Sequence, residues 1–237
     1  LPVLNPIMFT NFSGDKSDKS YGGFDIKMNI LKKFQLYAQG MIDGISFDDK
    51  LVNNWWGNRF AYQVGIKYIN AFEIKNLDAQ FETNVARPFM YASDNDVTTY
   101  THYNQPLAHP LGANFNEYIA ILKYQPLKKL YLETKAILYS QGKDTTFIVA
   151  GNRNFGSNIF TNVQTRPYDY GWTVTNGNVA TCTLIQLLVS YEVKENLFAD
   201  FSFMNRNFQL QSSNNSTNTS TVSFGLRWNI GRKEYLF

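Results

Sequence analysis

Two histidines, His102 and His109, are the first side chains here to suggest chemistry, because imidazole binds metals and transfers protons near neutral pH. Pro106 lies between them, and the nearby Asp94 and Asp96 follow no recognised ligand spacing. A metal site needs three or four ligands in a fixed geometry, so we predict no metal and no cofactor. The segment instead indicates a proline-stiffened loop that folds inward and hydrogen-bonds to the groups beneath it. Its candidate residues are His102, Asn104, Gln105, His109 and Asn114.

The sequence gives little support to a catalytic serine or to a glycosidase site. The chain has no G-x-S-x-G elbow. A loop histidine could meet Ser190 or Ser202, but no spacing places a base beside either hydroxyl. Two carboxylates facing each other could act as a glycosidase pair. The candidates are more simply explained as charges that line a water-filled cavity, and they are Asp78, Glu82, Glu133 and Glu192. We therefore predict that the protein is not an enzyme.

Aromatic residues make up 16% of the chain, and five of them lie at or near predicted long connections: Trp55, Trp56, Tyr168, Tyr170 and Trp172. Such rings have two interpretations. They can form the girdle at a membrane interface, or a platform that stacks on sugar rings beside Asn and Asp side chains. The girdle is favoured for the tryptophan pair. The other three lie too far from a strand end for the girdle to be the default.

The elements that must position these residues are β-strands. Nine segments alternate apolar and polar residues with a period of two. In the last of them Val222, Phe224 and Trp228 face one way, whereas Arg227 faces the other. The predicted strands are 21–31, 34–47, 59–72, 77–87, 116–125, 129–140, 181–193, 197–209 and 220–230.

Composition then favours a membrane barrel. Only 17% of the residues are charged, the net charge is +3, and no run of eighteen apolar residues could form a transmembrane helix. In lipid the alternative is a closed barrel, so we predict an all-β, antiparallel transmembrane outer-membrane β-barrel. Seven charges are predicted to line its lumen: Asp25, Lys27, Asp78, Glu82, Glu133, Lys135 and Arg227. The single cysteine, Cys182, excludes an internal disulfide.

The connections alternate between short and long. Short ones are expected at 32–33, 71–75, 126–128 and 194–196, and long ones at 48–58, 88–115, 141–180 and 210–219. Outer-membrane barrels place short turns in the periplasm and long loops outside the cell. We therefore expect a periplasmic C-terminus in a Gram-negative outer membrane. Nine is odd, so we expect residues 1–237 to be the C-terminal part of a larger barrel of roughly 18 strands, with 1–20 as an extracellular loop remnant.

The stretch from His102 to Asn114 is similar to a signature of the Wzi-type capsule-assembly family, closest to its Bacteroidetes-type branch with gliding-motility-associated proteins. Shorter segments earlier in the chain resemble the same branch more weakly and occur in the same order, namely 4–9, 55–58, 74–78 and 86–88. The resemblance implies a large outer-membrane barrel with a plugged or narrowed lumen. It also implies binding or organising of surface polysaccharide, or support of adhesion and gliding machinery, without enzyme activity.

These expectations define the partners. We expect outer-membrane lipid and lipopolysaccharide, surface polysaccharide, and the missing N-terminal half of the polypeptide or a partner chain. Nucleic acid is not expected, because the Lys and Arg residues form no basic stripe. Two other functions stay open, namely a porin-like channel and a structural subunit of an outer-membrane secretion or transport complex.

Overall fold

The computed structural model describes residues 19, 21–44, 53–95, 98–147, 151–213 and 216–229. Apart from Lys19, the predicted loop remnant 1–20 lies outside the described residues. The predicted strand end 45–47, Asp96 and Ile230 also lie outside them.

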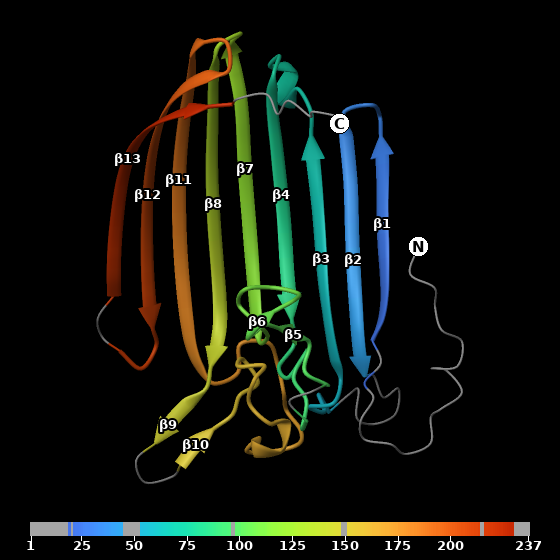
Figure 1. Ribbon diagram of the computed structural model, residues 1–237. Helices are drawn as coiled ribbons and strands as arrows, with labels where there is room; N and C mark the ends of the chain where they lie inside the picture. Colours follow the sequence, from blue (N-terminus) through green and yellow to red (C-terminus); the bar gives the residue numbers. More distant parts are fainter. Residues whose placement is uncertain are drawn as a thin grey trace, which may run out of the picture.

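One antiparallel sheet of nine strands dominates the described residues, and its strand order follows the chain (Figure 1). The all-β prediction is confirmed at this level, and the predicted ranges match the strands to within a few residues. The strands are β1 (Gly22–Ile30), β2 (Phe34–Gly44), β3 (Arg59–Tyr68), β4 (Leu77–Ala86), β7 (Phe115–Leu127), β8 (Leu130–Lys143), β11 (Asn178–Lys194), β12 (Leu197–Leu210) and β13 (Ser216–Trp228).

The register turns the sequence alternation into two different faces. Met28 pairs with Leu36, Leu36 with Ile66, and Ile66 with Phe81. Residues directly opposite in an antiparallel pair share a face, so these four side chains form one apolar row across β1 to β4. Other strands continue this outer face, and its side chains are exposed, with Phe224 at 80%.

The opposite face is polar. Lys27 pairs with Tyr37, Tyr37 with Gly65, and Gly65 with Glu82. Gly65 leaves room for the ring of Tyr37, because a Cβ at this glycine would lie 2.1 Å from the Tyr37 Cζ atom. The Tyr37 hydroxyl therefore reaches across β3 and lies 2.6 Å from the Glu82 carboxylate.

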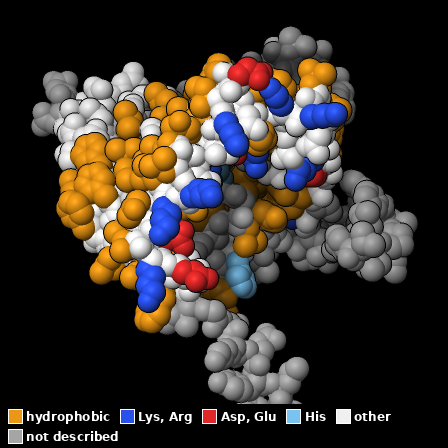
Figure 2. All heavy atoms as spheres, turned by 90° about the horizontal axis from the view of Figure 1, so that it is seen from above, with side chains coloured by type: hydrophobic (Ala, Val, Ile, Leu, Met, Phe, Trp, Pro, Cys, Tyr) orange, Lys and Arg blue, Asp and Glu red, His pale blue; other side chains and the backbone are white. Residues whose placement is uncertain are grey.

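The sheet is open within the described residues. Its edge strands, β1 and β13, are not paired with each other, so these residues form no closed barrel. Because nine strands alternate in direction, the two edge strands run the same way (Figure 1). Figure 2 shows hydrophobic side chains gathered along one side of the molecule and a band of charged side chains inside it.

Two predicted boundaries were wrong. The predicted strand 59–72 ends at Tyr68, because Asn70 and Phe72 take left-handed backbone angles and a short 3-10 helix, η2 (Ala71–Glu73), follows. The polar tip 210–219 was predicted as a loop. Instead β13 starts at Ser216, which pairs with Gln209 of β12.

The connections confirm the predicted sorting by length in part, because the β12–β13 connection at the long-connection end spans only 211–215. Four short turns lie at one end of the sheet and the long connections at the other (Figure 1). The long connections contain two small hairpins and the 3-10 helix η4 (Val163–Thr165). The hairpin strands are β5 (Thr101–His102), β6 (Gln105–Pro106), β9 (Thr145–Phe147) and β10 (Gly151–Arg153). Within the described residues, no helix has the length and apolar character needed to cross a membrane.

Candidate functional site

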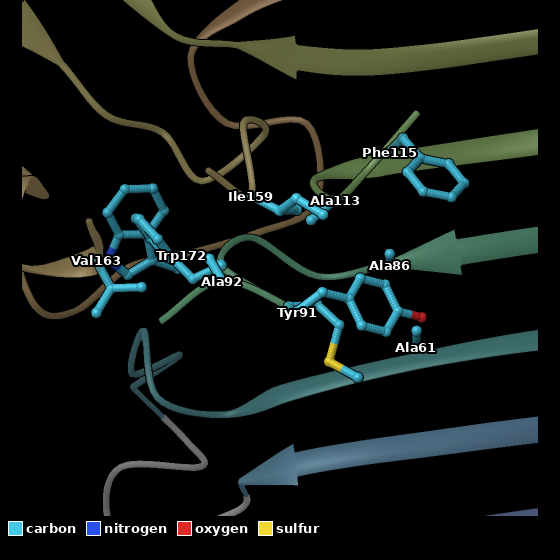
Figure 3. Close-up of a cluster of buried hydrophobic side chains, with 11 residues drawn as sticks. Ala61, Ala86, Tyr91, Ala92, Ala113, Phe115, Ile159, Val163 and Trp172 are labelled. Atoms are coloured by element: carbon cyan, nitrogen blue, oxygen red, sulfur yellow. The ribbon is translucent and has the colours of Figure 1, made fainter. Parts of the chain in front are cut away.

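The buried core of the molecule lies at the long-connection end, where connections 87–114 and 144–177 pack on the polar side of the sheet. Figure 3 shows Trp172, Val163 and Ile159 from one connection meeting residues of the other. We call this cluster the loop core. Its members are Phe89, Met90, Tyr91, Ala92, Ala113, Ile159, Val163 and Trp172, with Ala61, Ala86 and Phe115 from the strands.

Trp172 belongs to the loop core and is fully buried, at 0% exposed. Its ring stacks on Tyr168 with centroids 4.4 Å apart and meets the edge of Phe89 at 4.7 Å. The indole nitrogen donates a hydrogen bond to the Tyr168 carbonyl at 3.0 Å. The interpretation of Trp172 as a sugar-stacking platform is therefore wrong, because the side chain is fully buried and its N–H group is already hydrogen-bonded.

Asn114 joins the two connections to the sheet. It has a φ of 58°, is fully buried, and its Nδ2 lies within 2.9 Å of the carbonyl oxygens of Gly142, Phe155 and Asn176. Its Oδ1 accepts from the Thr175 backbone N–H at 2.7 Å. Asn tolerates the left-handed region better than most residues, so this prediction of an inward, hydrogen-bonding residue fits the structure.

Tight backbone packing supports the same junction. A Cβ at Gly156, whose φ is +77°, would lie 2.4 Å from the Phe89 nitrogen. A Cβ at Gly142 would lie 2.0 Å from the Asn176 carbonyl oxygen. Arg87, which directly follows β4, donates to the Trp172 carbonyl at 3.0 Å. Only glycine fits where these backbones approach, so the connections hold one defined arrangement.

His109 faces the sheet. Its Nε2 lies 3.1 Å from the Glu117 carboxylate, and its Nδ1 accepts the Leu111 backbone N–H at 3.2 Å. Because Nδ1 is an acceptor, the ring proton lies on Nε2 and is donated to Glu117. Glu117 also accepts from Asn84 at 2.9 Å, and the His109 ring stacks on Phe115 at 4.5 Å. His109 therefore has a structural role beneath the loop.

The hairpin tip of the same segment points elsewhere. The side chains of His102, Asn104 and Gln105 are exposed, and His102 packs against the ring of Tyr103 at 4.3 Å. The prediction that the whole stretch folds inward was wrong for these three residues. The β5–β6 turn is held by backbone pairing between His102 and Gln105, so these side chains are free to point away from the sheet.

The tryptophan pair packs within the long connections. The Arg166 guanidinium lies 4.0 Å from the Trp56 ring centroid, and Arg59 lies at 5.4 Å. The Trp55 and Trp56 rings meet edge to face at 5.6 Å. The Trp56 backbone N–H also donates to the Asp169 carbonyl at 2.9 Å. These contacts join the Trp55–Trp56 segment to the second connection.

Tyr168 and Tyr170 remain accessible, at 42% and 50% exposed. The buried Trp172 ring supports Tyr168 from below, with 28° between their planes. The Tyr168 hydroxyl accepts from the Asn176 amide at 3.1 Å, and Arg166 pairs with Asp169 at 2.7 Å. We call Tyr168, Tyr170 and Asn176, with their neighbours Arg166 and Asp169, the tyrosine platform. Arg166 and Asn176 were not predicted, because neither belongs to a periodic pattern.

The register gives no support to a Ser–His pair at His109. Glu117, the partner of His109, is aligned through Tyr139 with Cys182. Ser190 lies eight residues farther along β11, which is about 27 Å. Ser202 pairs with Leu188, about 20 Å along the same strand. Neither serine therefore lies beside His109.

The seven predicted lumen charges share the polar face. Asp78 on β4 pairs with Lys123 on β7, and Lys123 lies 3.4 Å from Glu133 on β8. Lys135 lies 3.9 Å from Glu133, and Arg227 lies 2.9 Å from Asp200. The register also places the other three charges on this face. Asp25 lies opposite Gln39, Lys27 opposite Tyr37, and Glu82 opposite Ile119. A pocket of about 540 Å³ lies between this face of β1 to β4 and connection 87–114.

A buried ion cluster was not predicted. Asp43, whose side chain is 1% exposed, lies 2.8 Å from the Lys19 ammonium and 3.2 Å from the Arg59 guanidinium. Lys19 also donates to the Ala92 carbonyl. Burial lowers the pKa of Lys19, and the Arg59 charge acts in the same direction. The cluster connects the start of the sheet to the loop core.

Comparisons with protein-family models, curated proteins and solved structures gave no match to this chain. In the described part of the chain, no three His, Cys, Asp or Glu side chains come together in a way that could hold a metal ion.

Proposed function

We propose that this chain forms part of the wall of an outer-membrane β-barrel and carries its own plug, and that it binds or organises surface polysaccharide without catalysing a reaction. The observation that carries the proposal is the exposed apolar outer face. Isolated apolar side chains on a surface are ordinary, but large continuous apolar patches mark interaction sites. Here the patch extends from β1 to β13, with Ile26 at 56% and Leu226 at 79% exposed.

The height of this face fits a bilayer. On β11 the outward apolar residues run from Ile185 to Val193, and the next outward positions toward the loops are Thr183 and Thr181. Eight steps along a strand span about 27 Å. With the usual tilt of about 40° this gives about 20 Å of height, close to the apolar band of about 25 Å on known barrels.

An aromatic row ends the face at the short turns. Phe34 stacks on Tyr68 with centroids 4.4 Å apart, and Tyr124, Tyr191 and Trp228 occupy outward positions near the same end. Amphipathic aromatic rings are enriched where a bilayer meets water. The row supports the assignment of the short-turn end to a membrane interface, on the periplasmic side.

Strand direction supports a larger barrel. A barrel whose neighbours are all antiparallel needs an even number of strands. Because β1 and β13 run the same way, closing this sheet in antiparallel fashion requires an odd number of further strands. We propose that these strands come from another segment of the polypeptide or from a partner chain.

The polysaccharide part of the proposal rests on the tyrosine platform and on the resemblance to the Wzi-type family. Tyr168 presents a supported ring beside the Asn176 amide, an arrangement suited to stacking on a sugar and hydrogen-bonding its hydroxyls. The loop core packs on the polar face, which favours a narrowed lumen over an open channel.

Membrane insertion can be tested with Trp228, which is 68% exposed on the outer face. We expect brominated lipids to quench tryptophan fluorescence of the protein folded in vesicles, and Trp228→Phe to remove most of that quenching. Trp55→Phe, at the loop end, is the matched control and should leave it in place. Quenching that survives Trp228→Phe unchanged would contradict insertion of this face.

Glycan binding can be tested separately on whole surface polysaccharide. The double change Tyr168→Ala with Tyr170→Ala should weaken binding by roughly tenfold or more, as expected for removing aromatic anchors. Tyr103→Ala is the control, since Tyr103 is 88% exposed on the β5–β6 hairpin and outside the platform. Equal binding by the three proteins would exclude the platform as the glycan site.

A further inference from the structure

The short-turn end of the sheet is basic. Residues 31–33, 69–76, 128–129 and 194–196 contain two glutamates, Glu73 and Glu195, and six lysines. We call the lysines the lysine rim: Lys32, Lys33, Lys75, Lys128, Lys129 and Lys194. Because successive strands run in opposite directions, all four connections lie at one end. Figure 2 views this end and shows Lys and Arg side chains distributed around the curve of the sheet.

The lysine rim is largely uncompensated. Among the described residues, the six lysines form one ion pair, between Lys33 and Glu73 at 2.7 Å. The loop end differs, because its charges are used internally. There Arg166 pairs with Asp169, and Asp144 accepts the Phe155 backbone N–H at 2.7 Å. Among the described residues, five lysines without an ion pair therefore lie together at the short turns.

Exposed apolar residues accompany the lysines. Leu31, beside Lys32, is 81% exposed, and Leu127, beside Lys128, is 63% exposed. Phe72, in the turn that contains Lys75, is 73% exposed. Leu31 and Phe72 also have positive φ angles of 50° and 55°. A turn exposed only to water gains nothing from placing large apolar side chains in such a conformation.

We propose that the lysine rim binds the phosphate groups of anionic phospholipids. At a bilayer interface Leu31, Phe72 and Leu127 can enter the boundary of the acyl chains, while the neighbouring lysines extend to the headgroups. The aromatic row of the outer face lies at the same end and meets the same interface. An acidic protein partner would match the lysines but would leave the apolar turn residues unexplained.

This inference rests on the proposed insertion in a membrane, and it adds the lipid class and the residues that select it. The test uses the complete barrel, that is, this chain together with the further strands proposed above, refolded in vesicles of neutral phosphatidylcholine with and without phosphatidylglycerol. The variant is Lys32→Gln with Lys128→Gln and Lys129→Gln. The matched control is Lys27→Gln with Lys67→Gln and Lys135→Gln, which removes three charges from the polar face instead.

Each surface lysine contributes about fivefold to binding of an anionic membrane, so the rim variant should lose roughly a hundredfold of its preference for phosphatidylglycerol vesicles. The control should keep most of it, and the wild-type preference should fall with added salt. Replacing the same three rim lysines by arginine should retain the preference, which separates lost charge from lost folding.

Two results would overturn the inference. Equal preference of the rim variant and the wild type, with both inserted, would leave the lysine rim without a lipid role. Complete competition by inorganic phosphate would indicate a site for the free anion instead. Failure of the wild type to insert into either vesicle would contradict the proposed membrane wall itself, so the two failures are distinguishable.

Discussion

Trp228 and Trp172 show how differently this protein uses one residue type. Trp228 lies on the outer face of β13 and is 68% exposed, whereas Trp172 lies in the loop core and is 0% exposed. The sheet thus exposes its apolar side chains in a regular row, while irregular connections bury theirs against the polar side. A water-soluble fold would do the opposite. The comparison supports the proposal that lipid surrounds the outer face, and it shows that the connections supply the buried core.

The largest expected change in stability comes from truncating the two tryptophans one at a time. Trp172→Ala should cost about 3–5 kcal/mol of the stability of the loop core, because it empties a fully buried site. Trp228→Ala, measured in detergent, should change stability by about 0.5 kcal/mol or less. Urea titration followed by near-ultraviolet circular dichroism measures both. Equal losses would show that the two regions do not differ in packing.

A charge placed on each face gives the next largest effect. Val64→Arg puts a cation on the outer face of β3 and should cost about 2–4 kcal/mol in vesicles if Val64 lies near the bilayer midplane. Gln63→Arg, one residue earlier, puts the same charge on the polar face and should cost much less. Unfolding in urea, followed by tryptophan fluorescence, gives the two values. The proposed orientation of the faces fails if Gln63→Arg is the more damaging change.

The smallest effect concerns the polar face alone. Tyr37→Phe removes the hydroxyl that lies 2.6 Å from Glu82 and accepts from Gln80 at 2.8 Å, so we expect a loss of about 1 kcal/mol. Tyr118→Phe, on the outer face, is the control and should be nearly neutral. The same urea titration checks both variants. A neutral Tyr37→Phe would mean that the hydrogen bonds of this face add little stability.

The strands were predictable because alternation is local. Segments such as 22–30 and 197–210 need only a count of every second residue to reveal their two faces. Ser216–Ser220 could not be assigned in this way, because its side chains are all small and polar. Pairing with β12 places these residues in a strand, and that pairing depends on backbone hydrogen bonds rather than on side-chain type.

The loop core was much less predictable. The resemblance singled out Asn114, yet the contacts of its amide with Gly142, Phe155 and Asn176 join positions far apart in the chain. Trp172 was predicted to be an accessible ring because its packing partner Phe89 lies far away in the sequence, and no local pattern indicates that contact. The Lys19–Asp43–Arg59 cluster has no sequence spacing that would reveal it. These sites depend on contacts that only folding creates.

The sequence by itself determined the nine amphipathic strands, the four short turns with their lysines and three of the four long connections, because each depends on neighbours within a few residues. The tertiary structure decided which aromatic rings are buried and that His109 meets Glu117 while His102 stays exposed. It also decided that, among the described residues, the two edge strands run in the same direction without pairing with each other. Those outcomes depend on strand register and on packing between distant segments, which no local pattern encodes.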